Sequence, residues 1–162
     1  MNQKRQLILL QVFAVFALAS ANSAAIECLV TKPSDWPAQN APTFGDNLTW
    51  YGSSSLAALV PDNGHWKGVG KSYSNKFWWW REGFSAIDEP KPRLKVIAQK
   101  LDGDRDLVII DRATSGMGLQ GEWHAMLIGM YFPSPGCWEV RGSYAEKEEL
   151  TLVLKVGGND DT

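Results

Sequence analysis

The last quarter of the chain carries two alternating segments that constrain its fold. In residues 137–144 the apolar Trp138 and Val140 alternate with polar residues, the period-two pattern of a strand with one buried face. Residues 150–156 alternate in the same way, with leucine or valine at every second position. The Ala-Glu-Lys-Glu-Glu segment between them is short and charged, as expected of an exposed hairpin loop. The pattern predicts two antiparallel strands, with Cys137 at the start of the first.

Residues 1–25 have the pattern of a cleaved export signal. Lys4 and Arg5 precede an apolar run at 7–18, and small residues follow at 19–21, where a signal peptidase reads the chain. The apolar run is short for a bilayer, which takes about 20 residues. A retained membrane anchor is the alternative, but we expect cleavage, no membrane insertion afterwards, and a periplasmic or secreted protein.

Both cysteines, Cys28 and Cys137, remain after cleavage. An even cysteine count in an exported chain predicts a disulfide between them. Two free thiols, or thiolates binding a metal with His65 and His124, are the alternatives, although the spacing matches no zinc signature. Lipidation of Cys28 needs a small residue before it, whereas Glu27 stands there. We expect a disulfide, with no metal and no cofactor.

The charge balance argues against nucleic acid as a partner. Loss of Lys4 and Arg5 with the signal lowers the basic count from 16 to 14, against 18 acidic residues. A mildly acidic domain lacks the basic field that supplies most nucleic-acid affinity. The remaining chain of about 140 residues is long enough for one domain with one core.

Turn residues divide the rest of the chain into short strand-like segments. Residues 26–47 contain three prolines and are expected to form an extended lead-in, 48–157 a β-sandwich, and 158–162 a flexible tail. Besides the two strands above, strand-like patterns occur at 48–51, 56–60, 65–69, 76–80, 94–101, 107–110 and 123–132. The last of these is apolar on both faces, as expected of a central strand that is covered on each side. No segment after the signal sustains helical spacing for three turns. The pattern predicts an all-β antiparallel sandwich, with 114–121 as a flexible loop.

The run Phe77-Trp78-Trp79-Trp80-Arg81 is the strongest candidate for a binding surface. In a strand Trp78 and Trp80 share one face, and Phe77 and Trp79 share the other. If one face is open, Trp78, Trp80 and Arg81 form an aromatic platform for a sugar ring or a protein. If the second sheet covers one face and the proline-rich lead-in with its tryptophan covers the other, the rings are structural, with Arg81 stacked on a tryptophan.

Other candidates carry weaker signals. Trp50 and Trp138 are expected in the core, because each lies in apolar alternation. The glycine-rich loop Ser115–Gly121 is a second candidate surface. Neither His65 nor His124 has the sequence context of a catalytic nucleophile. Four aspartates surround one turn, where a calcium site is a minor alternative because their spacing follows no known binding loop: Asp102, Asp104, Asp106 and Asp111.

Four segments of the chain carry a family resemblance: Cys28-Leu-Val-Thr-Lys-Pro, Trp50-Tyr-Gly, Phe77-Trp-Trp-Trp-Arg-Glu-Gly and Phe132-Pro-Ser-Pro-Gly-Cys-Trp-Glu-Val. Through them the chain resembles a group of uncharacterised exported bacterial proteins with a single immunoglobulin-like domain. The resemblance covers roughly residues 28–156. It implies an immunoglobulin-like antiparallel β-sandwich and export, and it brings no known activity or catalytic residues.

These features predict an exported, non-enzymatic binding or interaction module. Its partner would be an unknown protein or glycan of the cell envelope. One alternative is a carbohydrate-binding domain that uses the tryptophan platform, and another is an envelope protein inhibitor or a hydrolase.

Overall fold

The computed structural model describes residues 27–35, 41–42, 47–62, 66–70 and 72–157. The expected signal and tail lie outside these residues. So do His65 and Trp36, the tryptophan of the proline-rich lead-in. Within them the fold is all-β and contains no helix. Its strands are β1 (Leu48–Gly52), β2 (Ala57–Pro61), β3 (Lys67–Val69), β4 (Ser72–Trp80), β5 (Leu94–Lys100), β6 (Leu107–Ile110), β7 (Thr114–Met117), β8 (His124–Phe132), β9 (Gly136–Tyr144) and β10 (Glu148–Val156).

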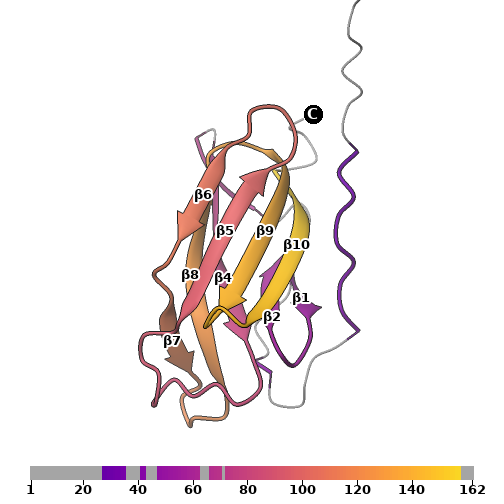
Figure 1. Cartoon of the computed structure of the whole chain (residues 1–162). Coiled ribbons are helices and arrows are strands. Elements are labelled where there is room, and N and C mark those ends of the chain that lie inside the picture. The colour runs from indigo at the N-terminus through magenta and orange to yellow at the C-terminus, as the bar shows by residue number, and fades with distance from the viewer. Residues whose placement is uncertain (1–26, 36–40, 43–46, 63–65, 71, 158–162) are drawn as a thin grey trace, which may run out of the picture.

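The strands form two antiparallel sheets that pack face to face (Figure 1). One sheet has the order β1-β2-β4-β8-β7, with β3 also paired to β4, and the other has the order β10-β9-β5-β6. Inward-facing side chains of both sheets form one hydrophobic core. In the part of the chain described, no helix is long and apolar enough to span a membrane.

The predicted pairing of the last two strands is confirmed. β9 and β10 are antiparallel neighbours, and Val140 lies opposite Leu152. Trp138, Val140 and Leu152 are fully buried, whereas Arg141 and Thr151 on the alternate face are exposed. A one-residue slip in the pairing register would turn every leucine of β10 to solvent. The observed register keeps them inside, so the alternation along each strand correctly predicts its buried face.

The loop between β9 and β10 is shorter than predicted. β10 already begins at Glu148, and the Lys147 N–H donates to the Tyr144 carbonyl over 3.1 Å. Ala145 and Glu146 between them have φ of 52° and 60°. This is the geometry of a type I′ turn, which usually has glycine or asparagine at these positions because other residues are strained there.

Two other segment predictions need correction. Residues 114–117 of the predicted flexible loop form strand β7, which pairs with β8 from Thr114↔Leu127 to Met117↔His124. β8 was expected to be apolar and covered on both faces, yet Tyr131 on its outer face is 52% exposed. β7 is a strand because it pairs with β8, whatever its composition. Tyr131 is exposed because its face of the sheet is open at this position.

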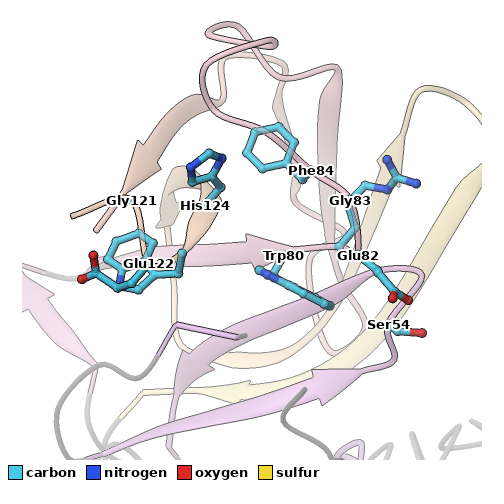
Figure 2. A pocket seen from close by; sticks show the side chains of 10 residues that line it. Ser54, Trp80, Glu82, Gly83, Phe84, Gly121, Glu122 and His124 are labelled. Atoms are coloured by element: carbon cyan, nitrogen blue, oxygen red, sulfur yellow. The ribbon is translucent and has the colours of Figure 1, made fainter. Parts of the chain in front are cut away.

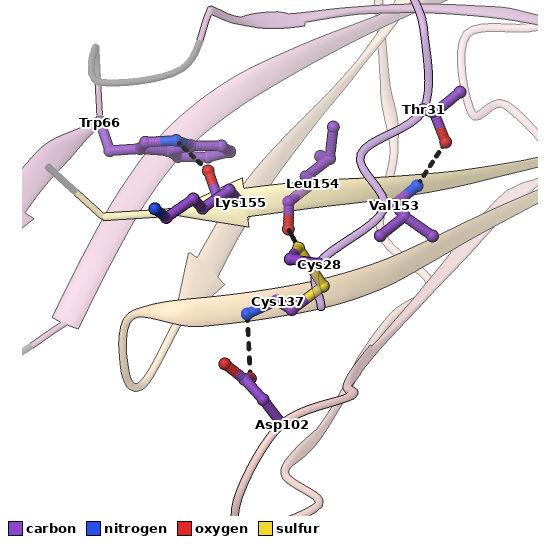
Figure 3. The surroundings of a disulfide bond; sticks show 8 residues. All are labelled: Cys28, Thr31, Trp66, Asp102, Cys137, Val153, Leu154 and Lys155. Atoms are coloured by element: carbon purple, nitrogen blue, oxygen red, sulfur yellow. Dashed lines mark hydrogen bonds between the residues drawn. A yellow bond between two sulfur atoms is a disulfide. The ribbon is translucent and has the colours of Figure 1, made fainter. Parts of the chain in front are cut away.

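A disulfide joins the lead-in to β9, as predicted. Cys28 and Cys137 are bonded, with their Cα atoms 5.5 Å apart, and Cys137 is buried (Figure 3). Beyond the disulfide, the Thr31 N–H donates to the Val153 carbonyl over 2.9 Å, and the Val153 N–H donates to Thr31 Oγ1 over 2.8 Å. The lead-in therefore lies along the outer edge of β10.

The same lead-in then crosses to the other sheet. The Ser34 N–H donates to the Trp50 carbonyl over 3.0 Å, its hydroxyl donates to the Gly52 carbonyl, and the Gly52 N–H donates back to Ser34 Oγ. One short segment thus satisfies backbone groups on the edge strands β10 and β1. Edge strands are usually protected in some such way, since their unpaired N–H and C=O groups invite pairing with other chains.

Candidate functional site

The tryptophan run of β4 divides between the two faces of its sheet. Phe77 and Trp79 point into the core and are fully buried. Trp78 and Trp80 take the outer face, where Trp78 is half-buried and Trp80 is 7% exposed. This face therefore does not present two fully exposed rings. Trp36 of the lead-in, which the sequence suggested as part of its cover, lies outside the described residues.

The strand next to β4 explains part of this burial. Ala57 and Leu59 of β2 lie opposite Trp80 and Trp78, and both are also buried on the outer face. Trp50 of β1 lies opposite Leu59 and is only half-buried, outside the core cluster. Its predicted core position was wrong, because alternation indicates which residues share a face but not which face the second sheet covers. Trp138 is in the core as predicted.

A pocket of about 620 Å³ lies at the end of the sandwich where β4 stops and β8 begins. Its lining comes from three places that are distant in sequence: the turn between β1 and β2, the segment that follows β4, and the segment that leads into β8. Figure 2 shows Trp80 on one side of the space, with His124 and Phe84 on the other. The lining residues are Ser54, Trp80, Arg81, Glu82, Gly83, Phe84, Gly121, Glu122, Trp123 and His124.

This pocket brings together two of the three predicted binding residues, Trp80 and Arg81. Trp78 does not line it. Trp78 instead packs edge-on against Trp123, with the ring centroids 5.7 Å apart and the planes at 83°. Because Trp123 does line the pocket, Trp78 supports the pocket wall from behind.

Arg81 is held in place by groups of the other sheet. Its guanidinium forms a 2.9 Å ion pair with Glu148 and lies over the Tyr144 ring, 4.8 Å from the centroid. The predicted cation–π contact therefore exists with Tyr144 rather than with a tryptophan. About a quarter of each side chain of the ion pair is exposed, so Arg81 has a fixed position and still reaches solvent at the pocket.

A second set of contacts fixes Tyr144 itself. The Tyr144 hydroxyl donates to the Glu89 carboxylate, which also accepts from the backbone N–H of Arg93 over 2.7 Å. Burial raises the pKa of the Glu89 carboxyl, but the hydrogen bonds from Tyr144 and Arg93 outweigh it, and the pKa is lowered overall. The pKa of Tyr144 is raised, by burial and by its bond to Glu89. Glu89 is thus an ionised anchor behind the pocket at neutral pH.

His124 has one ring nitrogen committed to the protein backbone. Its Nδ1 accepts a hydrogen bond from the Ala86 N–H over 3.0 Å. Since Nδ1 acts as the acceptor, the neutral imidazole carries its proton on Nε2. That N–H is a donor on a side chain that lines the pocket.

The loop that carries Glu122 and Trp123 is a tight turn. The Gly118 N–H donates to the Trp123 carbonyl and the Gly121 N–H to the Gly118 carbonyl, each over 2.9 Å. Glu122 accepts from the Gln120 N–H over 2.9 Å. The predicted loop surface Ser115–Gly121 therefore contributes only Gly121 to the pocket.

The polar side chains of the pocket are separate from one another. Ser54, Glu82, Glu122 and His124 line it, and no hydrogen bond joins any two of them within the residues described. Arg81, His124 and the two carboxylates offer separate donors and acceptors around aromatic rings.

The acidic turn of the sequence has structural contacts. Asp102 accepts from the Cys137 N–H over 2.9 Å, and Asp106 accepts from the Ser134 hydroxyl over 3.3 Å. Over the described ranges, no three His, Cys, Asp or Glu side chains come together as a metal site would require. The two cysteines are in the disulfide.

Comparisons with protein-family models, with curated proteins and with solved structures find no match to this chain. The fold and the end pocket together define an all-β, disulfide-linked protein of two packed antiparallel sheets, with an aromatic and charged pocket at one end.

Proposed function

We propose that this protein is an exported, non-enzymatic, immunoglobulin-like binding module that holds a small polar ligand in the end pocket. The observation that carries the proposal is the convergence of three aromatic rings, a fixed guanidinium and an imidazole around one space of about 620 Å³. Ligand sites in proteins are typically concave, about 300–1,000 Å³, and aromatic with a few placed polar groups.

The immunoglobulin-like assignment is supported by strand order. Immunoglobulin domains pack a sheet of order A-B-E-D against a sheet that contains G-F-C, with a further strand beside C in some types. β2-β4-β8-β7 and β10-β9-β5-β6 follow this order when read as A-B-E-D and G-F-C-C′. The resemblance of Phe132–Val140 to exported immunoglobulin-like proteins points the same way.

Export is supported by two independent features. The first 25 residues have the composition of a signal, and Cys28 and Cys137 form a disulfide, which persists in oxidising compartments. We infer a periplasmic or secreted location from these two features. Its partners would then be molecules of the cell envelope or of the medium.

Within this class, a saccharide is the second, more specific candidate. The apolar face of a sugar ring stacks on an aromatic side chain, while its hydroxyls bond to carboxylates and to N–H donors. Trp80 faces His124 and Phe84 across the pocket, and Glu82 and Glu122 lie at its sides (Figure 2). The pocket supplies both kinds of contact, although not through the Trp78/Trp80 platform that the sequence suggested.

The direct test fills the pocket. Ser54 is exposed and lines the space, so Ser54→Trp places an indole in it without disturbing the core. Ser55→Trp is the matched control, because Ser55 is exposed in the same turn but does not line the pocket. Binding of neutral, acidic and N-acetylated mono- and disaccharides is measured by calorimetry and by tryptophan fluorescence.

The saccharide candidate predicts that at least one sugar binds the wild type and the Ser55→Trp variant, and that Ser54→Trp abolishes this binding. If Ser54→Trp binds a sugar as tightly as wild type, the site lies elsewhere. If no sugar binds the wild type, the saccharide candidate is wrong, and a screen of chemically diverse fragments then tests the pocket itself.

A further inference from the structure

Strand β6 (Leu107–Ile110) is an apolar sheet edge that the described residues leave unpaired on its outer side. The lead-in bonds to β10 through Thr31 and to the edge strand β1 through Ser34. β7, a second edge, is as long as β6 but has the less apolar sequence Thr-Ser-Gly-Met. β3, which pairs only with β4, has three residues. β6 lies at the edge of its sheet (Figure 1) and pairs only with β5. Half of its backbone N–H and C=O groups therefore face outward.

The side chains of β6 are unusual for such an edge. Its sequence is Leu107-Val-Ile-Ile110, with Leu107 and Ile109 each 58% exposed on the outer face. Val108 and Ile110 pack against the core from the other face. An exposed edge strand with this composition is a template for pairing with another strand, and neither a proline nor a charge interrupts it.

The charges that flank β6 define which strand fits. Arg105 precedes it, Asp111 follows it, and both are exposed. Neither side chain has an ion-pair or hydrogen-bond partner among the residues described. If a second β6 approaches antiparallel about a two-fold axis at Val108, Leu107 meets the partner's Ile109 and Arg105 meets the partner's Asp111. Each contact occurs twice.

Neighbouring registers are less favourable. With the axis at Leu107, Arg105 would face the partner's Ile109 and Asp106 would face the partner's Val108, so that charges would oppose apolar residues. With the axis at Ile109, Leu107 would face the partner's Asp111. In the Val108-centred register, on the outer face, Leu107 meets the partner's Ile109 and Arg105 meets the partner's Asp111, so that apolar residues are paired and opposite charges are paired. On the inner face Asp106 meets the partner's Ile110.

We propose that this protein self-associates through β6, which pairs antiparallel with β6 of a second copy to make one continuous eight-stranded sheet. The contact is short and edge-on, so the interface is small and the dimer is weak, with a dissociation constant on the order of micromolar or higher. The end pocket takes no part in this association.

Analytical ultracentrifugation of the disulfide-bonded protein, at concentrations up to about 1 mM, tests the proposal. The expected result is a reversible monomer–dimer equilibrium. Ile109→Lys should abolish the dimer, because it places two like charges at the paired edge. A protein that is monomeric over the whole range overturns the proposal, and so does a dimer that Ile109→Lys leaves unchanged.

A charge-swap series tests the register. Arg105→Asp places carboxylates opposite Asp111 at both ends and should weaken the dimer about tenfold or more at low salt. Adding Asp111→Arg restores opposite charges and should restore the wild-type dissociation constant. Lys91→Asp, a charge reversal at an exposed site before β5, is the control and should have no effect. If the double variant is as weak as Arg105→Asp, the Val108-centred register is wrong.

Discussion

The contact between Gly142 and Trp79 gives the sharpest test of how the two sheets pack. Gly142 lies on the inner face of β9, and Trp79 reaches it from β4 of the opposite sheet. A Cβ added at Gly142 would lie 2.2 Å from Cζ3 and 2.3 Å from Cη2 of the Trp79 ring. Carbon atoms in contact prefer about 3.5–4.0 Å, so Gly142→Ala would have to push the ring or the sheets more than 1 Å apart.

The cost of that displacement is set by the surroundings of the ring. Trp79 is fully buried and lies within the core cluster, where side chains interdigitate with few voids. Overpacking in a well-packed core lowers the free energy of unfolding by about 1–3 kcal/mol. Because the indole is rigid and is packed on all sides, we expect Gly142→Ala to lower it by about 3 kcal/mol. For a domain of this size, the melting temperature should fall by roughly 10 °C.

Gly129→Ala is the matched control. Gly129 lies on the outer face of β8, and an added Cβ there meets no atom within 4 Å. Gly129→Ala should change the free energy of unfolding by no more than about 0.5 kcal/mol. The assay is urea unfolding of both variants with the disulfide intact, followed by tryptophan fluorescence. A Gly142→Ala variant as stable as Gly129→Ala would refute the described spacing of the two sheets.

Three further predictions concern the covalent link, a charged anchor and a turn. Replacing Cys28 and Cys137 together with serine should lower the free energy of unfolding by about 4–5 kcal/mol, since the disulfide closes a loop across 109 positions; urea unfolding that matches wild type would contradict this. Because the pKa of Glu89 is lowered in the folded state, its charge adds stability above its unfolded pKa, and this is lost as pH falls through the folded pKa. Glu89→Gln should therefore be less stable than wild type at pH 7, with the gap closing between about pH 5 and 3 in thermal melts; a gap that stays constant with pH would count against the ionised bond from Tyr144. Glu146→Gly should stabilise the protein by about 1 kcal/mol, because it removes a strained positive φ from the turn, and a loss of stability in the same melts would rule out that turn geometry.

The strands that sequence analysis located well are those in which local alternation and tertiary burial agree. β9 and β10 each have one apolar face, and the second sheet covers that face, so residues 137–144 and 150–156 could be read directly. The disulfide followed from the cysteine count and from the expected compartment. β7 was missed because Thr114–Met117 has the composition of a loop and is a strand only by virtue of its pairing with β8.

The pocket could be predicted only in part, because turns build most of it. Trp80 and Arg81 stood out as aromatic and cationic neighbours in a strand. Phe84 and Trp123 carried no comparable signal, since their positions depend on the path of the chain through Gly83 and Gly121, both with φ of 72°. Such a backbone path follows from tertiary contacts that alternation along a strand does not contain.

A fragment screen followed by two-dimensional ¹H–¹⁵N NMR tests the central claim, a binding pocket at the end of the sandwich, whatever the natural ligand is. Small polar and aromatic fragments gather at sites that are shaped to bind. We expect the shifted signals to cluster at the indole N–H groups of Trp80 and Trp123 and at the backbone of 81–84 and 121–124, and we expect Ser54→Trp to remove them. Hits that map to the exposed face of β6 or of Trp50, or no hits at all, would contradict it.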